Sequence, residues 1–408
     1  MADSKPAVLS AAGPALATAV SARVRPNVKL IGLLAAGHCV IDVNQGSLTA
    51  LLPFLKTAHA LSYAQAAMIL LMANLTSSII QPLFGYLSDQ TARRWLLPVS
   101  VMLSGIGLGL TGLAPSYTVV LVLIVVTGIG VAAWHPEGYK TATGVAGERK
   151  ATALSWFSFG GNVGIAVGPA IITALVTTLG LAGTLGMMVP SAIMAALIVS
   201  ALPLIARAAA PVRTGGAQAR GVNMPRALAL LIGVVTLRSW TTLGFSTFVP
   251  FFYIDVLRQD PAMVGPLLFV FLGGGALGSI VAGPLADRWG PRVFIRWVFL
   301  AALPFGIGFM LTAGALRFVM LGLFGALMTS SFSVSVVLAQ AYLPKNAGMA
   351  SGLIVGFAIG TGGVAVTLLG VIADNYGVTA ALWSAALLPL AGFAAARFLP
   401  TPRTATIQ

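Results

Sequence analysis

Two short stretches of this sequence decide how the rest of it is organised. The first reads Gly85-Tyr-Leu-Ser-Asp89-Gln-Thr-Ala-Arg93-Arg94, and the second reads Gly283-Pro-Leu-Ala-Asp287-Arg-Trp-Gly290-Pro-Arg292. A glycine, an aspartate and an arginine recur in both at one constant offset of 198 residues, from 85 to 283, from 89 to 287 and from 94 to 292. An offset close to half the chain indicates two related units that follow each other in parallel.

The composition identifies the environment of these units. Of the 408 residues, 58% are hydrophobic and only 8% are charged, whereas about 25% of the residues of a soluble globular protein are charged. Apolar runs of about 20 residues recur along the chain, which is the length needed to cross a bilayer as a helix. The runs are continuous and do not alternate, so a β-barrel is excluded. The sequence therefore predicts an all-α polytopic membrane protein.

Twelve transmembrane helices can be placed, six on each side of the longest joint. We expect an N-terminal six-helix bundle at 28–206 and a C-terminal, pseudo-symmetric six-helix bundle at 225–399, joined by a cytoplasmic linker at 207–224. Residues 1–27 are predicted to be a flexible cytoplasmic tail. A cleaved signal peptide is disfavoured, because the positively charged region that begins such a peptide is weak here. Residues 400–408 are predicted to form a second cytoplasmic tail.

The positions of Lys and Arg predict the orientation in the membrane. Nineteen of the 23 basic residues fall in segments on the side of the N-terminus, and only Lys56, Arg258 and Arg317 fall on the opposite side. Basic residues accumulate on the cytoplasmic side of membrane proteins. Both termini are therefore expected in the cytoplasm of a bacterial cell, with the chain in the inner (cytoplasmic) membrane. The remaining basic residue, Arg238, falls inside a predicted helix.

Several functional classes are excluded or disfavoured. The formal charge of +14 does not indicate nucleic-acid binding, since the basic residues flank apolar runs and do not form a polar face. One cysteine, Cys39, excludes a disulfide framework and a thiolate metal site, and we expect no metal and no cofactor. No nucleotide-binding loop of the Gly-x-x-x-x-Gly-Lys type is present, so a proton gradient is the expected energy source. An intramembrane enzyme and a receptor are disfavoured.

The duplicated Gly-x-x-x-Asp-x-x-x-x-Arg pattern, after spans two and eight of twelve, resembles the major facilitator superfamily. The chemistry of the pattern fits moving halves, because glycine allows close helix approach, aspartate can bond backbone N–H groups, and arginine can pair with a carboxylate or with terminal carbonyls. We expect the following residues to gate the conformational change: Gly85, Asp89, Arg94, Gly283, Asp287 and Arg292.

Glycines recur at helical spacing in the fifth predicted span, at Gly160, Gly164 and Gly168, with Gly161 beside them. Such a stripe predicts close packing against another helix. Gly164-x-x-x-Gly168-Pro169 also resembles the superfamily's antiporter motif, although Ile172 and Thr173 replace its trailing glycines. Ordinary helix packing and an antiporter role both stay open for this stripe.

Placing an ionisable side chain inside the membrane costs several kcal/mol of free energy, so each one predicts a functional site. Asp42 lies about 13 residues into the first span, and His38 precedes it by one helical turn on the same face. The two side chains can share a proton. An interhelical hydrogen bond without a functional role is the alternative.

The fourth span contains a second ionisable group of residues, Trp134-His135-Pro136-Glu137-Gly138. Proline removes a backbone N–H, and we expect a helix break there that turns polar groups toward a cavity. His135 and Glu137 join His38 and Asp42 as predicted proton-coupling residues. In the alternative interpretation Glu137 is only an ion-pair partner of Lys140.

Arg238 is the cation nearest the membrane midplane, and it occupies the place in the second half that Asp42 occupies in the first. A permanent charge there either pairs with Asp42 or Glu137 or binds an anionic substrate. Substrate contacts are also expected from three uncharged residues: Gln45, Asn162 and Trp240.

The first half has a narrower likeness as well. His38-x-x-x-Asp42-x-x-Gln45-Gly46, together with Trp134-His135-Pro136-Glu137-Gly138, resembles the fosmidomycin-resistance branch of the superfamily. That resemblance implies a monomeric secondary transporter that exports a small, anionic drug or metabolite such as fosmidomycin in exchange for protons, by alternating access. A proton-coupled importer or a facilitator of a small organic anion remains the alternative.

Overall fold

Twelve long helices make up the described part of the chain, which covers residues 26–90, 93–147, 150–208 and 222–402 of a computed structural model. The predicted all-α class is confirmed. The first six are α1 (Val28–Ala58), α2 (Tyr63–Gln90), α3 (Leu96–Thr111), α4 (Tyr117–Val145), α5 (Lys150–Leu179) and α6 (Met188–Ala208). The second six are α7 (Pro225–Phe251), α8 (Val264–Trp289), α9 (Pro291–Leu311), α10 (Gly314–Tyr342), α11 (Ala347–Tyr376) and α12 (Val378–Ala396).

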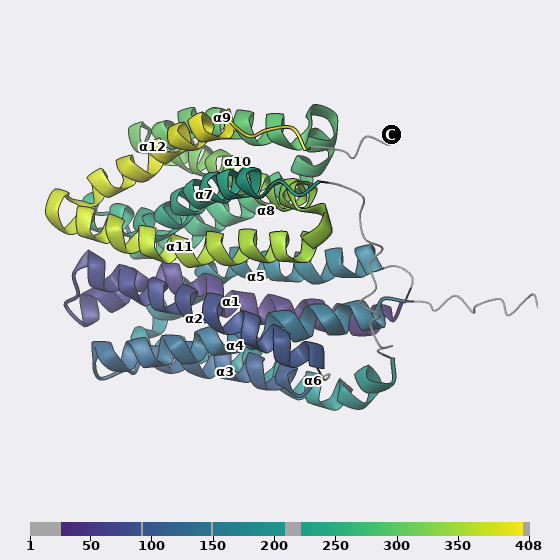
Figure 1. Cartoon of the computed structure of the whole chain (residues 1–408). Coiled ribbons are helices and arrows are strands. Elements are labelled where there is room, and N and C mark those ends of the chain that lie inside the picture. The colour runs from purple at the N-terminus through teal and green to yellow at the C-terminus, as the bar shows by residue number, and fades with distance from the viewer. Residues whose placement is uncertain (1–25, 91–92, 148–149, 209–221, 403–408) are drawn as a thin grey trace, which may run out of the picture.

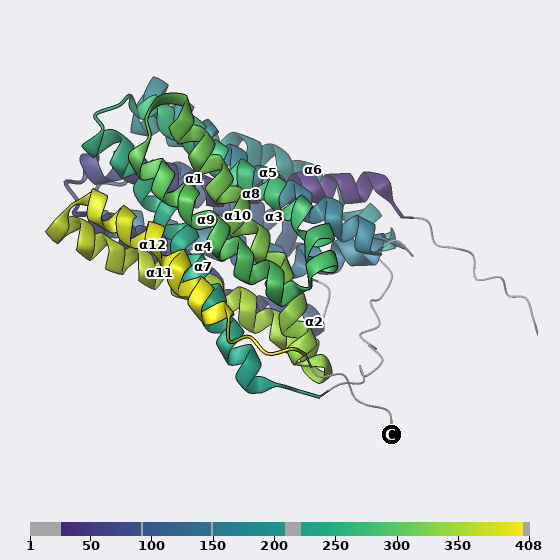
Figure 2. The same cartoon turned by 90° about the horizontal axis from the view of Figure 1, so that it is seen from above.

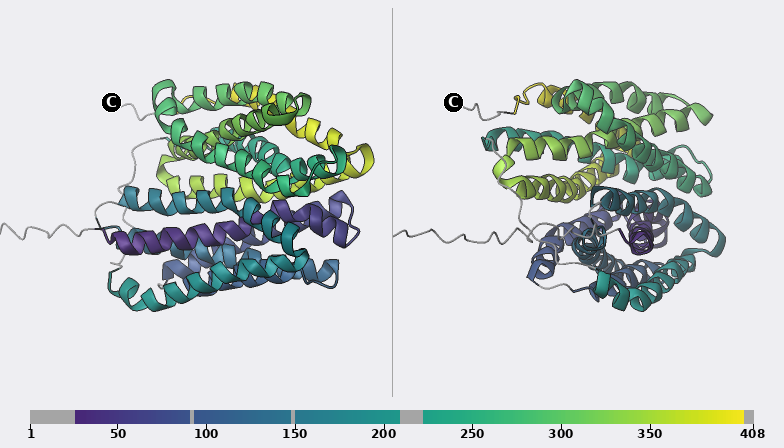
Figure 3. Two further views of the ribbon diagram at one scale, coloured as in Figure 1. Left: turned by 180° about the vertical axis from the view of Figure 1, so that it is seen from behind. Right: turned by 90° about the vertical axis from the view of Figure 1, so that its right-hand side faces the viewer.

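The helices form two layers, one for each half of the sequence. In Figure 1 helices α1–α6 lie below and α7–α12 lie above, and the views from behind and from the side show the same division (Figure 3). Contacts between the halves come mainly from α2 with α11 and from α5 with α8. The predicted tails and most of the predicted linker fall at 1–25, 209–221 and 403–408, outside the described residues.

The two ends of the helix bundle differ in what lies there. The turns that close the pairs α1–α2, α3–α4, α5–α6, α7–α8, α9–α10 and α11–α12 all lie at one end, which we name the hairpin end (Figure 1). The duplicated sequence pattern lies at the opposite end, which we name the motif end. The helices run roughly along the axis that joins these ends, with mutual tilts that are visible from above (Figure 2).

Most of the described helices are long and apolar enough to cross a membrane. Nine pass on length and hydropathy among the residues that the structure describes, and α3 is a shorter apolar helix. Helix α1 is not among the nine although it has 31 residues. Its middle contains His38, Asp42, Asn44 and Gln45, which lower its mean hydropathy, and all four are buried or half-buried in the protein.

The glycine stripe of α5 packs directly on α1. A Cβ atom added at Gly160 would lie 2.1 Å from the carbonyl oxygen of Ala35, and one added at Gly164 would lie 2.2 Å from that of Cys39. One at Gly168 would lie 2.4 Å from the carbonyl oxygen of Val43. Hydrogen is the only side chain that fits at these distances, so the stripe fixes the backbones of α1 and α5 at close range.

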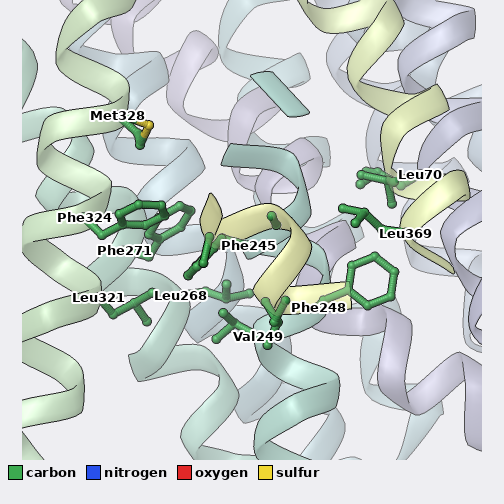
Figure 4. Packing of buried hydrophobic residues seen from close by; sticks show 14 of the residues in the cluster. Leu70, Phe245, Phe248, Val249, Leu268, Phe271, Leu321, Phe324, Met328 and Leu369 are labelled. Carbon is green, nitrogen blue, oxygen red and sulfur yellow. The ribbon is translucent and has the colours of Figure 1, made fainter. Parts of the chain in front are cut away.

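Phenylalanine rings fill the core of the second half (Figure 4). The ring of Phe245 on α7 lies 4.4 Å from that of Phe324 on α10 and 6.2 Å from that of Phe271 on α8, measured between centroids. Such rings bury large apolar areas in defined geometry. The same apolar cluster reaches the first half, where Leu70 of α2 lies close to Leu369 of α11 (Figure 4).

One local expectation was wrong. Helix α4 runs without a break through Pro136, because one lost hydrogen bond is tolerated in a helix that is enclosed by its neighbours. The ring of Phe157 on α5 packs where Gly138 has no side chain, and this contact holds the segment in place. Between α5 and α6 lies a 3-10 helix, η1 (Leu181–Met187).

The close contact of α5 with α1 generates a prediction about stability. Replacing Gly164 with Val should lower the thermal midpoint of the detergent-solubilised protein, because overpacking costs about 1–3 kcal/mol. The matched control is Gly32→Val on α1, where an added Cβ meets nothing within 4 Å. If both variants unfold at the temperature of the unchanged protein, the contact does not stabilise the bundle.

Candidate functional site

Three of the predicted proton-coupling residues meet inside the first half. His38 and Asp42 on α1 lie one turn apart, with 3.3 Å between Nε2 of the histidine and Oδ2 of the aspartate. His135 on α4 brings its Nε2 to 3.3 Å from Nε2 of His38 and to 3.8 Å from Oδ1 of Asp42. His38 and Asp42 are buried, and His135 is half-buried. We name this group the His–Asp–His cluster.

The other nitrogen of each histidine is committed to a backbone carbonyl. Nδ1 of His38 lies 2.8 Å from the carbonyl oxygen of Phe157, and Nδ1 of His135 lies 2.8 Å from that of Val131. A carbonyl oxygen only accepts hydrogen bonds, so both Nδ1 atoms must carry the proton. In the neutral rings, therefore, the two Nε2 atoms are unprotonated and face each other and the carboxylate.

This arrangement concentrates acceptor atoms. Two imidazole lone pairs and two carboxylate oxygens face one another in a buried space, where unbalanced acceptors are costly. A single added proton turns one of these acceptor–acceptor contacts into a hydrogen bond, and any of the three side chains can carry it. One nitrogen or oxygen atom from each side chain lies within 4.8 Å of the others, a spacing that would also accommodate a metal ion.

Helix α5 closes the cluster from the side. A Cβ atom at Gly161 would lie 2.6 Å from Oδ2 of Asp42 and 2.7 Å from Nε2 of His38. The ring of Phe157 stacks on His38, with 4.2 Å between the ring centroids. Gly161 was expected only beside a packing stripe, and Phe157 was not predicted. Phe157 contributes a backbone carbonyl and a ring face, neither of which has a sequence signature.

Glu137 is placed differently from the other predicted proton-coupling residues. It is buried on α4, two residues after His135. Residues two apart on an α-helix point about 200° away from each other. The structure therefore brings His38, Asp42 and His135 together and directs Glu137 to another face of α4.

Arg238 on α7 is the buried cation of the second half, with 8% of its surface exposed. One guanidinium nitrogen donates to the hydroxyl of Ser239 at 3.1 Å, and the guanidinium carbon lies 4.7 Å from the centroid of the Phe332 ring. Among the described residues no carboxylate lies within ion-pair distance of it. Its Nε is buried without a partner. The expected alternative of pairing with Asp42 or Glu137 is not seen.

The remaining predicted substrate contacts are dispersed. Gln45 borders a small hollow between α1, α2 and α4. Asn44 and Asn74 border the same hollow, and each has a buried amide atom without a partner. Trp240 is half-buried with an unpartnered indole N–H, and Asn162 is exposed on α5.

In the second copy of the duplicated pattern, the predicted gating residues form no ion pair with any residue that the structure describes. Asp287 is exposed, without an ion pair among the described residues, and Arg292 donates to the hydroxyl of Thr401. An added Cβ at Gly283 would meet nothing within 4 Å, so the close approach expected there is absent. Arg94 is half-buried, whereas the side chains of Gly85 and Asp89 lie outside the described residues.

Comparison with known proteins completes the description. The sequence pattern of the Major Facilitator Superfamily matches residues 34–363. The chain belongs to this superfamily. The resemblance inferred from the duplicated pattern is thereby confirmed, and the protein is a membrane-embedded transporter of small molecules, with relatives in bacteria.

Two relatives match over nearly their whole length. The uncharacterized MFS-type transporter YfnC of Bacillus subtilis is 32% identical over 384 residues, covering 91% of this chain and 92% of its own. The fosmidomycin resistance protein of Escherichia coli is 30% identical over 395 residues, covering 95% and 96%.

Solved structures share the fold at low identity. A bacterial homolog of the human lysosomal transporter Spinster, inward-facing and unoccupied, has a TM-score of 0.73 at 16% identity and covers 91% of this chain and 94% of its own. The nucleoside transporter NupG has a TM-score of 0.72 at 13% identity and covers 91% and 98%.

The fixed tautomers of the cluster can be measured directly. The chain contains only three histidines, so ¹⁵N-histidine labelling and solid-state NMR will resolve individual rings. We expect His38 and His135 to show protonated Nδ1 at a pH where the rings are neutral, with His38→Gln and His135→Gln assigning the signals. Protonated Nε2 with bare Nδ1 in either ring would contradict the hydrogen bonds described above.

Proposed function

We propose that this protein is a proton-coupled exporter of small anionic compounds in the bacterial cytoplasmic membrane. The observation that carries the proposal is the division of buried charge between the halves. A cation without a described carboxylate partner, Arg238, lies in the second half, and the His–Asp–His cluster lies in the first. We also propose that the protein is a monomer with both termini in the cytoplasm, without catalytic activity or a cofactor.

The environment of Arg238 supports an anionic substrate. A guanidinium is permanently charged, and burying it without a counter-charge costs several kcal/mol. The aromatic face of Phe332 offsets part of this cost. An anion that enters between the halves would supply the missing counter-charge, and the planar guanidinium can hold a carboxylate or phosphonate by two parallel hydrogen bonds.

The His–Asp–His cluster supports coupling to protons. One added proton forms a hydrogen bond within the cluster. When that proton is lost, the acceptor atoms repel one another. Loading and unloading this proton therefore changes the free energy of the packed region between α1, α4 and α5. Such a change can favour one orientation of the halves over the other, which is what exchange of substrate for proton needs.

Fosmidomycin is the first compound to test, because the relative from Escherichia coli bears its name and because its phosphonate is an anion. Everted membrane vesicles separate the proposal from the alternative of proton-coupled import or facilitated diffusion. An imposed gradient, acidic inside the vesicle, should drive accumulation of labelled fosmidomycin if the protein exchanges substrate for protons. An importer would release it, and a facilitator would be insensitive to the gradient.

Asp42→Asn should abolish gradient-driven transport while the protein still folds. The amide cannot take up a proton, so the coupled rate should fall on the order of tenfold or more, with an unchanged thermal midpoint. Asp260→Asn is the control, since Asp260 lies at the hairpin end and caps only its own short helix. Gradient dependence that survives Asp42→Asn would remove Asp42 from the coupling role.

Arg238→Lys should weaken substrate binding although the charge is retained. A lysine cannot form the two parallel bonds of the guanidinium, and we expect affinity for the anion to fall about tenfold, which corresponds to about 1.4 kcal/mol. Arg226→Lys, at the exposed start of the same helix, should leave binding unchanged. Titration of purified protein with fosmidomycin measures both, and an affinity of the Arg238→Lys variant equal to that of the unchanged protein would argue against direct contact.

A further inference from the structure

Among the residues that the structure describes, polar contacts between the two halves gather at the hairpin end. The carboxylate of Asp374, near the end of α11, accepts from the backbone N–H of Tyr63 at 2.7 Å and from that of Ala64 at 3.0 Å. These two N–H groups begin α2, in the other half. A carboxylate at a helix N-terminus satisfies donors that have no partner within their own helix and is favoured by the helix dipole.

A second carboxylate joins the same place. Asp255 lies in a π-helical turn, η2 (Phe252–Val256), that continues α7. Its Oδ2 accepts from the hydroxyl of Tyr63 at 2.7 Å and lies 3.7 Å from Nζ of Lys56 at the end of α1. Nζ of Lys56 also stands 4.4 Å from the centroid of the Tyr63 ring. Two acids of the second half thus hold the first turn of α2 and the last turn of α1.

The packing of α2 on α11 shows that the halves separate away from this end. An added Cβ at Gly370 would lie 2.7 Å from Cα of Ala64, and one at Gly363 would lie 2.8 Å from Leu71. Further toward the motif end, a Cβ at Gly360 would lie 3.5 Å from Ser78, and one at Gly356 would meet no atom of a described residue within 4 Å. The exposed Asp287 and the open space beside Gly283 lie at that same end.

We propose that Asp374 and Asp255 are gating residues that hold the transporter closed at the hairpin end, in the state seen here. The opposite state, open at the hairpin end, requires α11 and η2 to move away from α1 and α2 there, and this separation breaks all four polar contacts. An isolated exposed ion pair contributes little. Asp374 differs from such a pair because it binds two backbone N–H groups that are otherwise unpartnered, and Asp255 adds contacts with the neighbouring side chains.

The inference depends on the transporter family and not on the proposed substrate or on proton coupling. It can be tested by electron–electron distance measurement on purified protein in nanodiscs, in a Cys39→Ser background. One spin-label pair spans the hairpin end, at Ala58 and Tyr376, and a second pair spans the motif end, at Trp95 and Trp289. Within each pair one site lies in each half, and all four sites are exposed.

Asp374→Ala should increase the population of long distances across the hairpin end at least threefold and shorten the distances across the motif end. Asp255→Asn should shift both distributions in the same directions by less. Asp260→Asn, at the same end but bonded only within its own loop, should leave both distributions unchanged.

The reciprocal change separates gating from local loosening. Longer distances at the hairpin end with unchanged distances at the motif end would mean that Asp374 only anchors the start of α2, and the proposal would be overturned. Unchanged distributions in the Asp374→Ala, Asp255→Asn double variant would also overturn it. Neither outcome depends on whether fosmidomycin is transported, so failure of the proposed function is recognised separately.

Discussion

The cost of placing charge in a medium without water governs this structure. Only 32 of the 408 side chains are Lys, Arg, Asp or Glu, and Asp42 and Arg238, deep in the membrane-spanning helices, are enclosed by protein. Asp42 is buried beside two imidazoles, and Arg238 is buried against an aromatic ring. A few kcal/mol for each buried charge is a large fraction of the stability of a protein. Such a cost persists only where the charge has a task or a full complement of partners.

Helix packing helps to enclose the buried charge. The close approach of α5 to α1 through Gly160, Gly164 and Gly168 leaves no room for lipid or bulk water beside Asp42. In the second half, the phenylalanine core around Phe245 ties α7, α8, α9 and α10 into one packed unit. Each half therefore has a dense interior, and one apolar cluster continues across the contact between the halves.

The sequence was sufficient for the fold because period and composition are local properties. Apolar runs of membrane-spanning length and a pattern repeated at 85–94 and 283–292 required no knowledge of tertiary contacts. It also paired His38 with Asp42, since residues four apart share a helix face. His135 was singled out as an ionisable residue within a span, but its meeting with His38 depends on tertiary packing.

Contacts made by backbone atoms, such as the carbonyl of Phe157, could not be predicted, because any residue type provides them. Asp374 and Asp255 were overlooked because both lie near helix ends, where an acidic residue is ordinary.

Helix α5 contacts both the His–Asp–His cluster and the second half. One face of it lies against the carboxylate of Asp42 at Gly161, and beyond Gly168 it contacts the start of α8, where Ala170 meets Gly265. The helix is therefore a mechanical link between the interior of one half and the surface of the other. Since the contact at Gly161 tolerates no added carbon atom, a slide of α5 by a fraction of its own pitch would present a side chain to the carboxylate in place of a hydrogen. Through α5, movement of the second half can therefore change the surroundings of Asp42.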